Sequence, residues 1–134
     1  MGSRRSARII ALQALYQIDI CGKSHLEILA FDWLDKQFDQ RVTDYAKSLI
    51  EGYVQNRDFI DSTIVRQLEH WELKRVSYVD RAILRFSTFS LYFQDDVPDS
   101  VAINEAVDLA KIYGSDDSYR FINGVLDGIR KQKK

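Results

Sequence analysis

The sequence predicts an all-α protein, and three observations support this. Apolar residues recur at steps of three and four in most segments, which is the period of an amphipathic helix. One proline, Pro98, and six glycines leave little material for the many tight turns of a β-sandwich. The length of 134 residues, with 46% hydrophobic and 29% charged residues, suits one globular domain. Because no linker or internal repeat is visible, residues 1–134 are predicted to form a single domain.

Four helices are predicted in the first half of the chain. Residues 3–19 carry an apolar stripe, and Gly22 supplies a stop. A second, less regular segment covers residues 25–38. Asp39 is placed to cap a third helix, and Asn56 to cap a fourth.

The fifth segment, residues 77–93, is the most hydrophobic. Its apolar side chains cover most of the helix circumference, which predicts a central, buried position. Arg81 and Arg85 are four positions apart, so they lie on the same side of this helix. Two arginines that close to a core need either water or a partner for their charge.

Two further helices are predicted near the C-terminus. Pro98 and Asp99 open the sixth in the usual order for a helix N-terminus, and Gly114 ends it. The polar loop at residues 115–118 then caps the seventh. The sequence therefore predicts seven helices.

The sequence lacks the patterns of several other protein classes. It has no apolar run near the roughly 18 residues of a transmembrane helix, so no membrane partner is expected. No signal peptide is visible, since Gln13 breaks the N-terminal apolar stretch, and the expected compartment is the cytoplasm. Cys21 is alone and cannot form an intramolecular disulfide. No metal-ligand spacing, phosphate-binding loop or nucleophile elbow is present, so we expect no metal, no cofactor and no enzymatic activity.

The charges are unevenly distributed along the chain. All 20 acidic residues lie between two basic ends, against 12 basic residues in the same stretch. The basic ends consist of Arg4, Arg5 and Arg8, and of Arg130, Lys131, Lys133 and Lys134. This asymmetry suggests contact with a polyanion at the ends, and the alternative is that both ends are solubilising tails.

The first helix carries the clearest signal for RNA. Arg4 and Arg8 share one side of the helix and Arg5 lies beside them, so the three can meet several phosphates. Tyr16 lies two turns further on, where it is either a core residue or a ring that stacks on a base.

The start of the last helix is a second candidate site. The N-terminal N–H groups of a helix favour an anion. Phe121 lies off the apolar stripe, so its ring is expected to be exposed beside Arg120 as a stacking platform. The carboxylates of Asp116 and Asp117 oppose phosphate binding and suit capping or a hydrogen bond to a base edge.

Several stretches together resemble the NusB family of bacterial transcription antitermination factors. The similar segments run nearly from end to end: RRSAR at 4–8 leading into ALQALYQ at 11–17, VDRAILR at 79–85, VAINEAV at 101–107 with LAK at 109–111, DS at 117–118, and FINGVL at 121–126. The resemblance implies seven helices in two packed three-helix bundles. It also implies binding of boxA-type single-stranded RNA jointly with NusE, a protein of the small ribosomal subunit. This assembly joins RNA polymerase and suppresses termination, particularly on ribosomal RNA operons.

The resemblance also assigns residues. By similarity, the RNA-binding surface comprises Arg4, Arg5, Arg8, Tyr16, Arg85, Asp117, Ser118 and Phe121. Asp80 matches an acidic family position that matters for assembly with NusE, although glutamate is expected there. The N-terminal basic cluster is lean for the family, which would make RNA affinity depend more on NusE. Some relatives pair as homodimers.

Two alternatives stay open from the sequence. Some ribosomal RNA cytosine methyltransferases carry a related RNA-binding domain at their N-terminus, but this chain ends without a catalytic domain or cofactor motif. A protein-only scaffold with basic, solubilising ends is the other alternative, and it predicts no RNA binding.

Overall fold

The computed structural model describes residues 3–69 and 72–133, which contain seven α-helices, one 3₁₀ turn and no strand. The helices are α1 (Ser3–Cys21), α2 (His25–Ile28), α3 (Gln40–Gln55), α4 (Arg57–Val65), α5 (Tyr78–Phe93), α6 (Asp99–Tyr113) and α7 (Ser118–Gln132), and the 3₁₀ turn is η1 (Leu73–Arg75). The predicted all-α class and the number of helices are confirmed.

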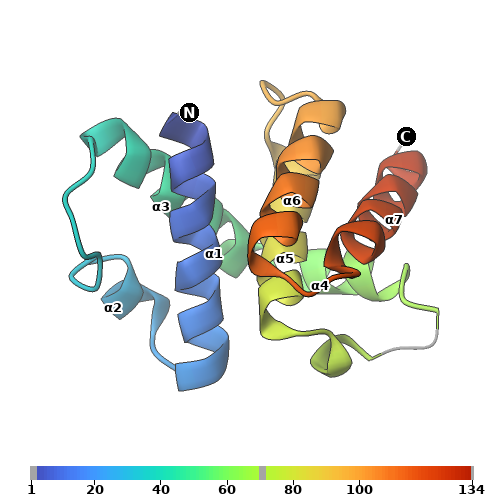
Figure 1. Ribbon diagram of the computed structural model, residues 1–134, viewed down its shortest axis with the longest axis horizontal. Helices are drawn as coiled ribbons and strands as arrows, with labels where there is room; N and C mark the ends of the chain where they lie inside the picture. The colour runs from blue at the N-terminus through green and yellow to red at the C-terminus, as the bar shows by residue number, and fades with distance from the viewer. Residues whose placement is uncertain (1–2, 70–71, 134) are drawn as a thin grey trace.

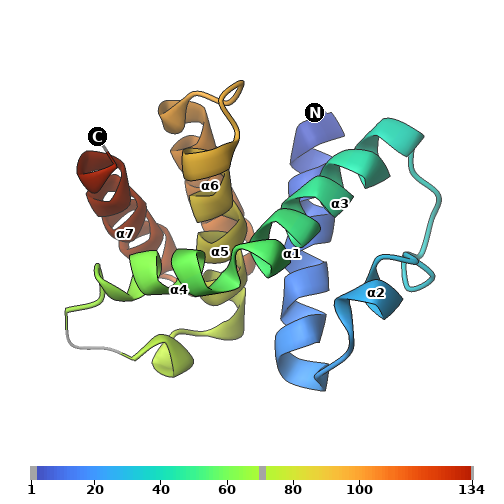
Figure 2. The same ribbon diagram turned by 180° about the vertical axis from the view of Figure 1, so that it is seen from behind.

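The helices form two groups that meet along α1 and α5 (Figure 1). In one group α1, α2 and α3 pack together, and in the other α5 packs against α6 and α7. Helix α4 follows α3 directly and crosses beneath α5 and α7, as the view from behind shows (Figure 2). The two packed three-helix bundles implied by the resemblance are therefore present, with α4 as the connecting helix.

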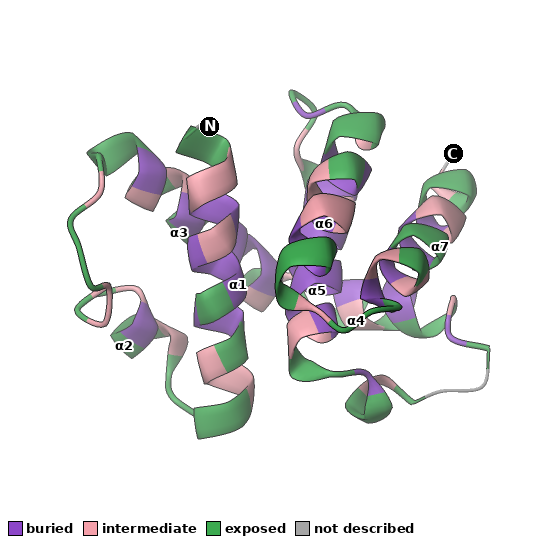
Figure 3. Ribbon diagram, viewed as in Figure 1, coloured by how far each residue is buried: buried purple, intermediate pink, exposed green. Residues whose placement is uncertain are grey.

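The largest apolar cluster runs through both groups. It includes Leu12 and Leu15 of α1, Leu49 of α3, Phe86 of α5 and Leu126 of α7, each at most 4% exposed. Buried positions accordingly cover much of α5, including its middle (Figure 3). Helix α5 is central, as its apolar circumference predicted.

The second segment differs from the prediction, because α2 ends at Ile28 rather than continuing to residue 38. Phe31 adopts a positive φ of 57°, a left-handed conformation that no helix continues through. The indole N–H of Trp33 donates to the Ile28 carbonyl at 2.9 Å, which satisfies one of the final groups of α2. The rings of Phe31 and Trp33 pack against a small apolar cluster that includes Val42. Burying these rings therefore stabilises the chain more than a longer helix would.

Most predicted helix ends are confirmed. The Asp39 side chain caps α3, and Gly22 has a φ of 65° just after the end of α1. Ser77 caps α5 by accepting from a backbone N–H at 3.1 Å. Asn56 precedes α4, but its side chain makes no capping bond there. Its amide instead donates to the Gly52 carbonyl at 2.8 Å and closes the end of α3.

Within residues 3–69 and 72–133, no helix is both long and apolar enough to cross a membrane. The same residues contain no group of three or more His, Cys, Asp or Glu side chains arranged to hold a metal ion.

Candidate nucleic-acid interface

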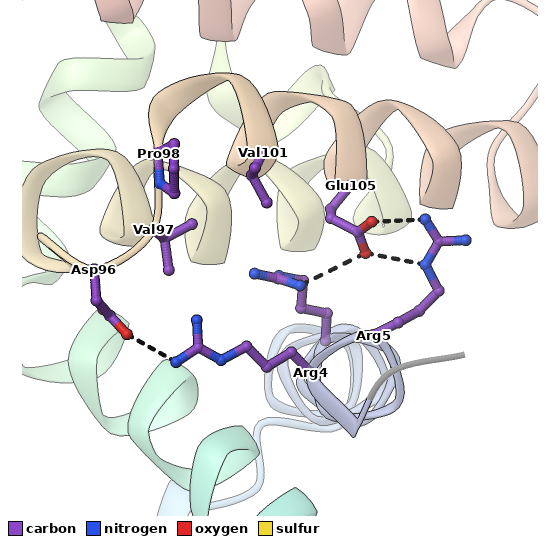
Figure 4. A pocket seen from close by; sticks show the side chains of 8 residues that line it. Arg4, Arg5, Asp96, Val97, Pro98, Val101 and Glu105 are labelled. Carbon is purple, nitrogen blue, oxygen red and sulfur yellow. Dashed lines mark hydrogen bonds and ion pairs between the residues drawn. The ribbon is translucent and has the colours of Figure 1, made fainter.

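The N-terminus of α1 lies against α6, so the arginines predicted to meet phosphates face carboxylates of this chain (Figure 4). Arg5 donates to Glu105 through Nε at 3.0 Å and through Nη2 at 2.7 Å, and its Nη2 also donates to Asp108 at 2.7 Å. These hydrogen bonds raise the pKa of the Arg5 guanidinium and lower the pKa of the Glu105 carboxyl. Arg5 is thus held by a two-point contact with an additional acid beside it.

Arg8 and Arg4 complete this cluster. The Arg8 side chain is only 5% exposed and lies 3.6 Å from Glu105. Arg4 is more open: its Nη2 donates to Asp96 at 2.7 Å, and its guanidinium lies 4.7 Å from the Tyr45 ring centroid. The hydrogen bond from Arg4 lowers the pKa of Asp96. A hollow of about 380 Å³ separates the two helices at this point.

Three positive charges therefore face three carboxylates at the N-terminus, and the C-terminus shows a similar arrangement. Lys133 donates to Asp99 at 2.7 Å and to the Leu91 carbonyl at 2.6 Å. Arg130 and Lys131 both pair with one acidic residue of α7, and Lys134 lies outside the described residues. The prediction that Arg4, Arg5 and Arg8 could be a solubilising tail is wrong, because they belong to a folded helix with ion-pair partners.

Tyr16 is not a core residue, and its stacking on a base stays a prediction. Its side chain is 38% exposed. The ring packs edge-to-face on Tyr78 with a centroid distance of 6.0 Å. Together with Trp33 and Tyr113, it lines a groove of about 500 Å³. An aromatic side chain in an open groove is available to a base.

The start of α7 lines another hollow, of about 400 Å³. The Asp117 carboxylate is 88% exposed, caps nothing and lies 3.9 Å from Arg120. Phe121 is half-buried against the core, so one part of the ring remains accessible and the expectation of a fully exposed ring is wrong. Ser118 is buried, and its hydroxyl accepts from the Ser115 N–H at 2.9 Å, which fixes the loop before α7.

Asp80 lines the same hollow from α5. Its side chain is 8% exposed, and Oδ1 accepts no hydrogen bond from any described residue. Burial raises the pKa of Asp80, against the hydroxyls of Ser118 and Ser77, which lower it. A buried carboxylate oxygen without a hydrogen-bond partner is costly to the folded state.

Arg85 lies elsewhere. Its guanidinium donates to Asp61 at 3.0 and 3.1 Å and to Asp19 at 2.8 and 2.9 Å. It also lies 4.9 Å from the Tyr53 ring, whose hydroxyl donates to Asp61 at 3.0 Å. The predicted need for charge partners on α5 is therefore met inside the protein. A role of Arg85 in RNA binding stays a prediction.

The other candidate residues follow α6 along one face. Arg5 meets α6 at Glu105, Tyr16 shares a groove with Tyr113 at the end of α6, and the loop after α6 leads to Asp117. The arginine cluster, the aromatic groove and the hollow at α7 thus form a series of sites rather than one pocket.

Comparison with known proteins identifies the family of this chain. The model of the NusB family matches residues 5–131. The chain is 42% identical to the transcription antitermination protein NusB of Bacillus cereus (strain ATCC 10987 / NRS 248), over 95% of this chain and 96% of that protein. This chain belongs to the NusB family. The NusB structure from T. maritima superposes with a TM-score of 0.89 at 39% identity, covering 96% of this chain and 91% of that one.

A second solved structure shows antitermination factors NusB and NusE in complex with dsRNA. It has a TM-score of 0.81 at 29% identity and covers 98% of both chains. NusB is a family of transcription antitermination factors, not an enzyme family. The relative from Bacillus cereus is named as an antitermination protein, which favours that family role over a methyltransferase domain.

The sequence did not reveal the acidic partners of the NusB arginine cluster. Asp96, Glu105 and Asp108 are 92 to 103 positions away from the arginines that they contact. The one available signal was that Glu105 and Asp108 are three apart on a helix and therefore share a face.

Proposed function

We propose that this protein is a transcription antitermination factor that binds boxA-type single-stranded RNA jointly with NusE. In this role it joins the RNA polymerase antitermination complex, acts in the cytoplasm and catalyses no reaction. Family membership supports the proposal, as does the solved structure of NusB with NusE and RNA. The observation that carries it is the hollow that Asp80 shares with Asp117 and Phe121. There, the position implied for NusE adjoins positions implied for RNA.

The described surface suits two kinds of RNA contact. Arginine contacts to phosphates supply affinity that depends on salt and is independent of sequence. Stacking of unpaired bases on Phe121 and Tyr16, with an edge contact from Asp117, supplies selectivity. Because only Arg4 of the three arginines is largely open, phosphate contacts alone are few, and we expect affinity to depend on NusE.

The place of Asp80 supports a joint role of NusE. Its Oδ1 is buried, accepts no hydrogen bond from a described residue and lines the hollow, where a group that enters could donate to it. Assembly of NusE and RNA at this point supplies such donors. Each ligand then favours binding of the other, because both stabilise the same arrangement of α5 and α7.

Fluorescence anisotropy tests the proposal directly. Labelled boxA RNA, a scrambled single strand and a double-stranded boxA are each titrated with and without NusE, at two salt concentrations. We expect selective binding of the boxA single strand that tightens when NusE is present. Equal binding of all three RNAs that NusE does not change and that salt abolishes would overturn the proposal and favour a basic-ended scaffold.

Pairing of two copies stays a prediction of the resemblance. If the two copies covered the RNA face, the apparent affinity for boxA RNA would fall as protein concentration rises. Analytical ultracentrifugation over the same concentration range measures the pairing itself.

A further inference from the structure

In the free protein each of the three arginines of this cluster faces a carboxylate of the same chain, and Arg5 is the most fully hydrogen-bonded. Two donors of Arg5 hold Glu105, and one of these also holds Asp108. Arg4 uses Nη2 on Asp96, at 2.7 Å. Carboxylate and phosphate bind a guanidinium in the same two-point geometry, so they compete for the same edge of the side chain.

The three pairs differ in how easily they can open. Arg4 and Asp96 are 48% and 66% exposed, so water and ions reach both partners. Arg5 and Glu105 are 20% and 21% exposed, and the contact has two points. Arg8 is 5% exposed and lies 3.6 Å from Glu105, so it is the least accessible of the three.

We infer that Asp96 and Asp108, with Glu105 behind them, act as internal competitors that hold down the affinity of the arginine cluster for RNA phosphates. This inference rests on the proposed RNA-binding function. A phosphate that takes the Nη2 edge of Arg4 displaces Asp96, and one that takes the Nη2 group of Arg5 displaces Asp108. Arg8 and Glu105 stay in place and keep α1 against α6.

The opposite role for these acids is positioning. In that case Asp96 would orient Arg4 toward the RNA, and its removal would weaken binding. The geometry favours competition. Asp96 belongs to an exposed loop and pairs with a guanidinium that the Tyr45 ring already supports at 4.7 Å. Arg4 therefore keeps a defined location without its acid.

The test is Asp96→Asn, with Asp95→Asn as the matched control. Asp95 is exposed, adjacent in the chain, and forms no ion pair with any residue in the described part of the chain. Both variants remove one negative charge from the same loop, but only Asp96→Asn releases Arg4. We expect Asp96→Asn to tighten boxA binding in the presence of NusE by about 1.5- to 5-fold, the range of an exposed ion pair. Asp95→Asn is expected to leave the affinity nearly unchanged because its charge is screened.

Two further features separate competition from a general charge effect. The affinity of Asp96→Asn for the scrambled RNA should rise by a similar factor, because phosphate contacts carry no sequence information. The slope of log K against log salt should steepen by up to about 0.7, since one more phosphate is neutralised without freeing a carboxylate. The Asp108 side chain is 47% exposed, and Asp108→Asn should also tighten RNA binding. The variant that carries both Asp96→Asn and Asp108→Asn should bind RNA more tightly than either single variant.

A measurement on the carboxylate itself provides a second readout. In the free protein Arg4 lowers the pKa of Asp96. When boxA RNA and NusE bind, the released carboxylate should return toward its ordinary pKa, which NMR of a selectively labelled aspartate would report.

The outcomes distinguish this inference from the proposed function. If the unaltered protein with NusE does not bind boxA RNA, both fail. If the unaltered protein binds boxA RNA, the affinities of the two variants decide the inference. An affinity of Asp96→Asn that is equal to or lower than that of Asp95→Asn overturns the inference alone. Melting curves for each variant verify that the exposed substitutions leave the fold intact.

Discussion

Phe121 is the aromatic side chain best placed to stack on a base at the start of α7. Because its ring is half-buried, replacement removes both core contacts and the accessible face. We expect Phe121→Ala to weaken boxA binding by about 1–3 kcal/mol, the cost of losing one stacked base. Phe59→Ala is the matched control, since Phe59 is 43% exposed in a separate aromatic cluster with Tyr92 and Phe93. Equal losses of affinity per folded molecule in both variants would remove Phe121 from the RNA surface.

Asp80 predicts a pH dependence of stability. Because burial raises its pKa above the ordinary value of 3.8, folding disfavours the charged form. The stability that protonation of Asp80 gives the folded protein is therefore fully present below pH 3.8. It is lost as the pH rises through the pKa of Asp80 in the folded state. Asp80→Asn should unfold at a higher temperature than the unaltered protein at neutral pH, and the difference should close on acidification through this window.

The same melting series with Asp95→Asn should show no such convergence, because that carboxylate is exposed. If Asp80→Asn instead lowers the melting temperature at neutral pH, the carboxylate stabilises the fold. Its pairing with NusE would then lose its main structural argument.

Among the elements, α3 and α5 approach each other closely at Gly52. A Cβ added there would overlap the Phe89 ring, whereas a Cβ at Gly124 of α7 would meet nothing within 4 Å. Gly52→Ala should therefore lower the free energy of unfolding by about 1–3 kcal/mol through overpacking. Gly124→Ala, also inside a helix, should raise it by about 0.5–1 kcal/mol. Urea denaturation measures both, and two stabilised variants would contradict the tight α3–α5 contact.

At the scale of the whole molecule, Arg85 joins the two groups of helices. It binds Asp19 of α1 and Asp61 of α4, and its guanidinium lies over Tyr53 of α3. Arg85→Ala leaves two partly buried carboxylates without their partner, so we expect a loss of about 3–5 kcal/mol in the free energy of unfolding.

The control for Arg85 is Arg41→Ala, because the Arg41 side chain is 87% exposed and its ion pair with Asp39 should leave the stability nearly unchanged when removed. Guanidinium denaturation followed by circular dichroism compares the two, and a single transition in each would support the predicted single domain. If Arg85→Ala kept its stability but lost RNA affinity, Arg85 would belong to the RNA surface, as the resemblance implies.

Local signals in the sequence predicted most of the elements. Helical periodicity located α1, α3 and α5, and the predicted cap at Asp39 depends only on neighbouring residues. The prediction of a helix after α2 was wrong because Phe31 and Trp33 gain more from packing on α1 and α3 than from continuing a helix. That gain depends on tertiary contacts, which periodicity does not report.

The candidate site was only partly predictable for the same reason. Arg4, Tyr16 and Phe121 could be proposed from the sequence because their types suit phosphates and bases, and their roles stay predictions. The carboxylates that neutralise the arginines were missed because ion pairs across about 100 positions leave no local pattern in the sequence. Likewise, only the fold shows that Asp80 adjoins Asp117 and that Arg85 is enclosed.

The contact between Arg5 and Glu105 also determines when α1 can reach its folded environment during synthesis on the ribosome. The two residues are 100 positions apart, and at about 5–20 residues added per second Glu105 is made roughly 5–20 s after Arg5. Until the chain has passed residue 93, α1 lacks all three of its acidic partners and the complete surface of α5 on which it packs. The nascent chain therefore carries three uncompensated guanidinium groups beside ribosomal RNA, and the first helix to be synthesised is among the last to reach its final environment.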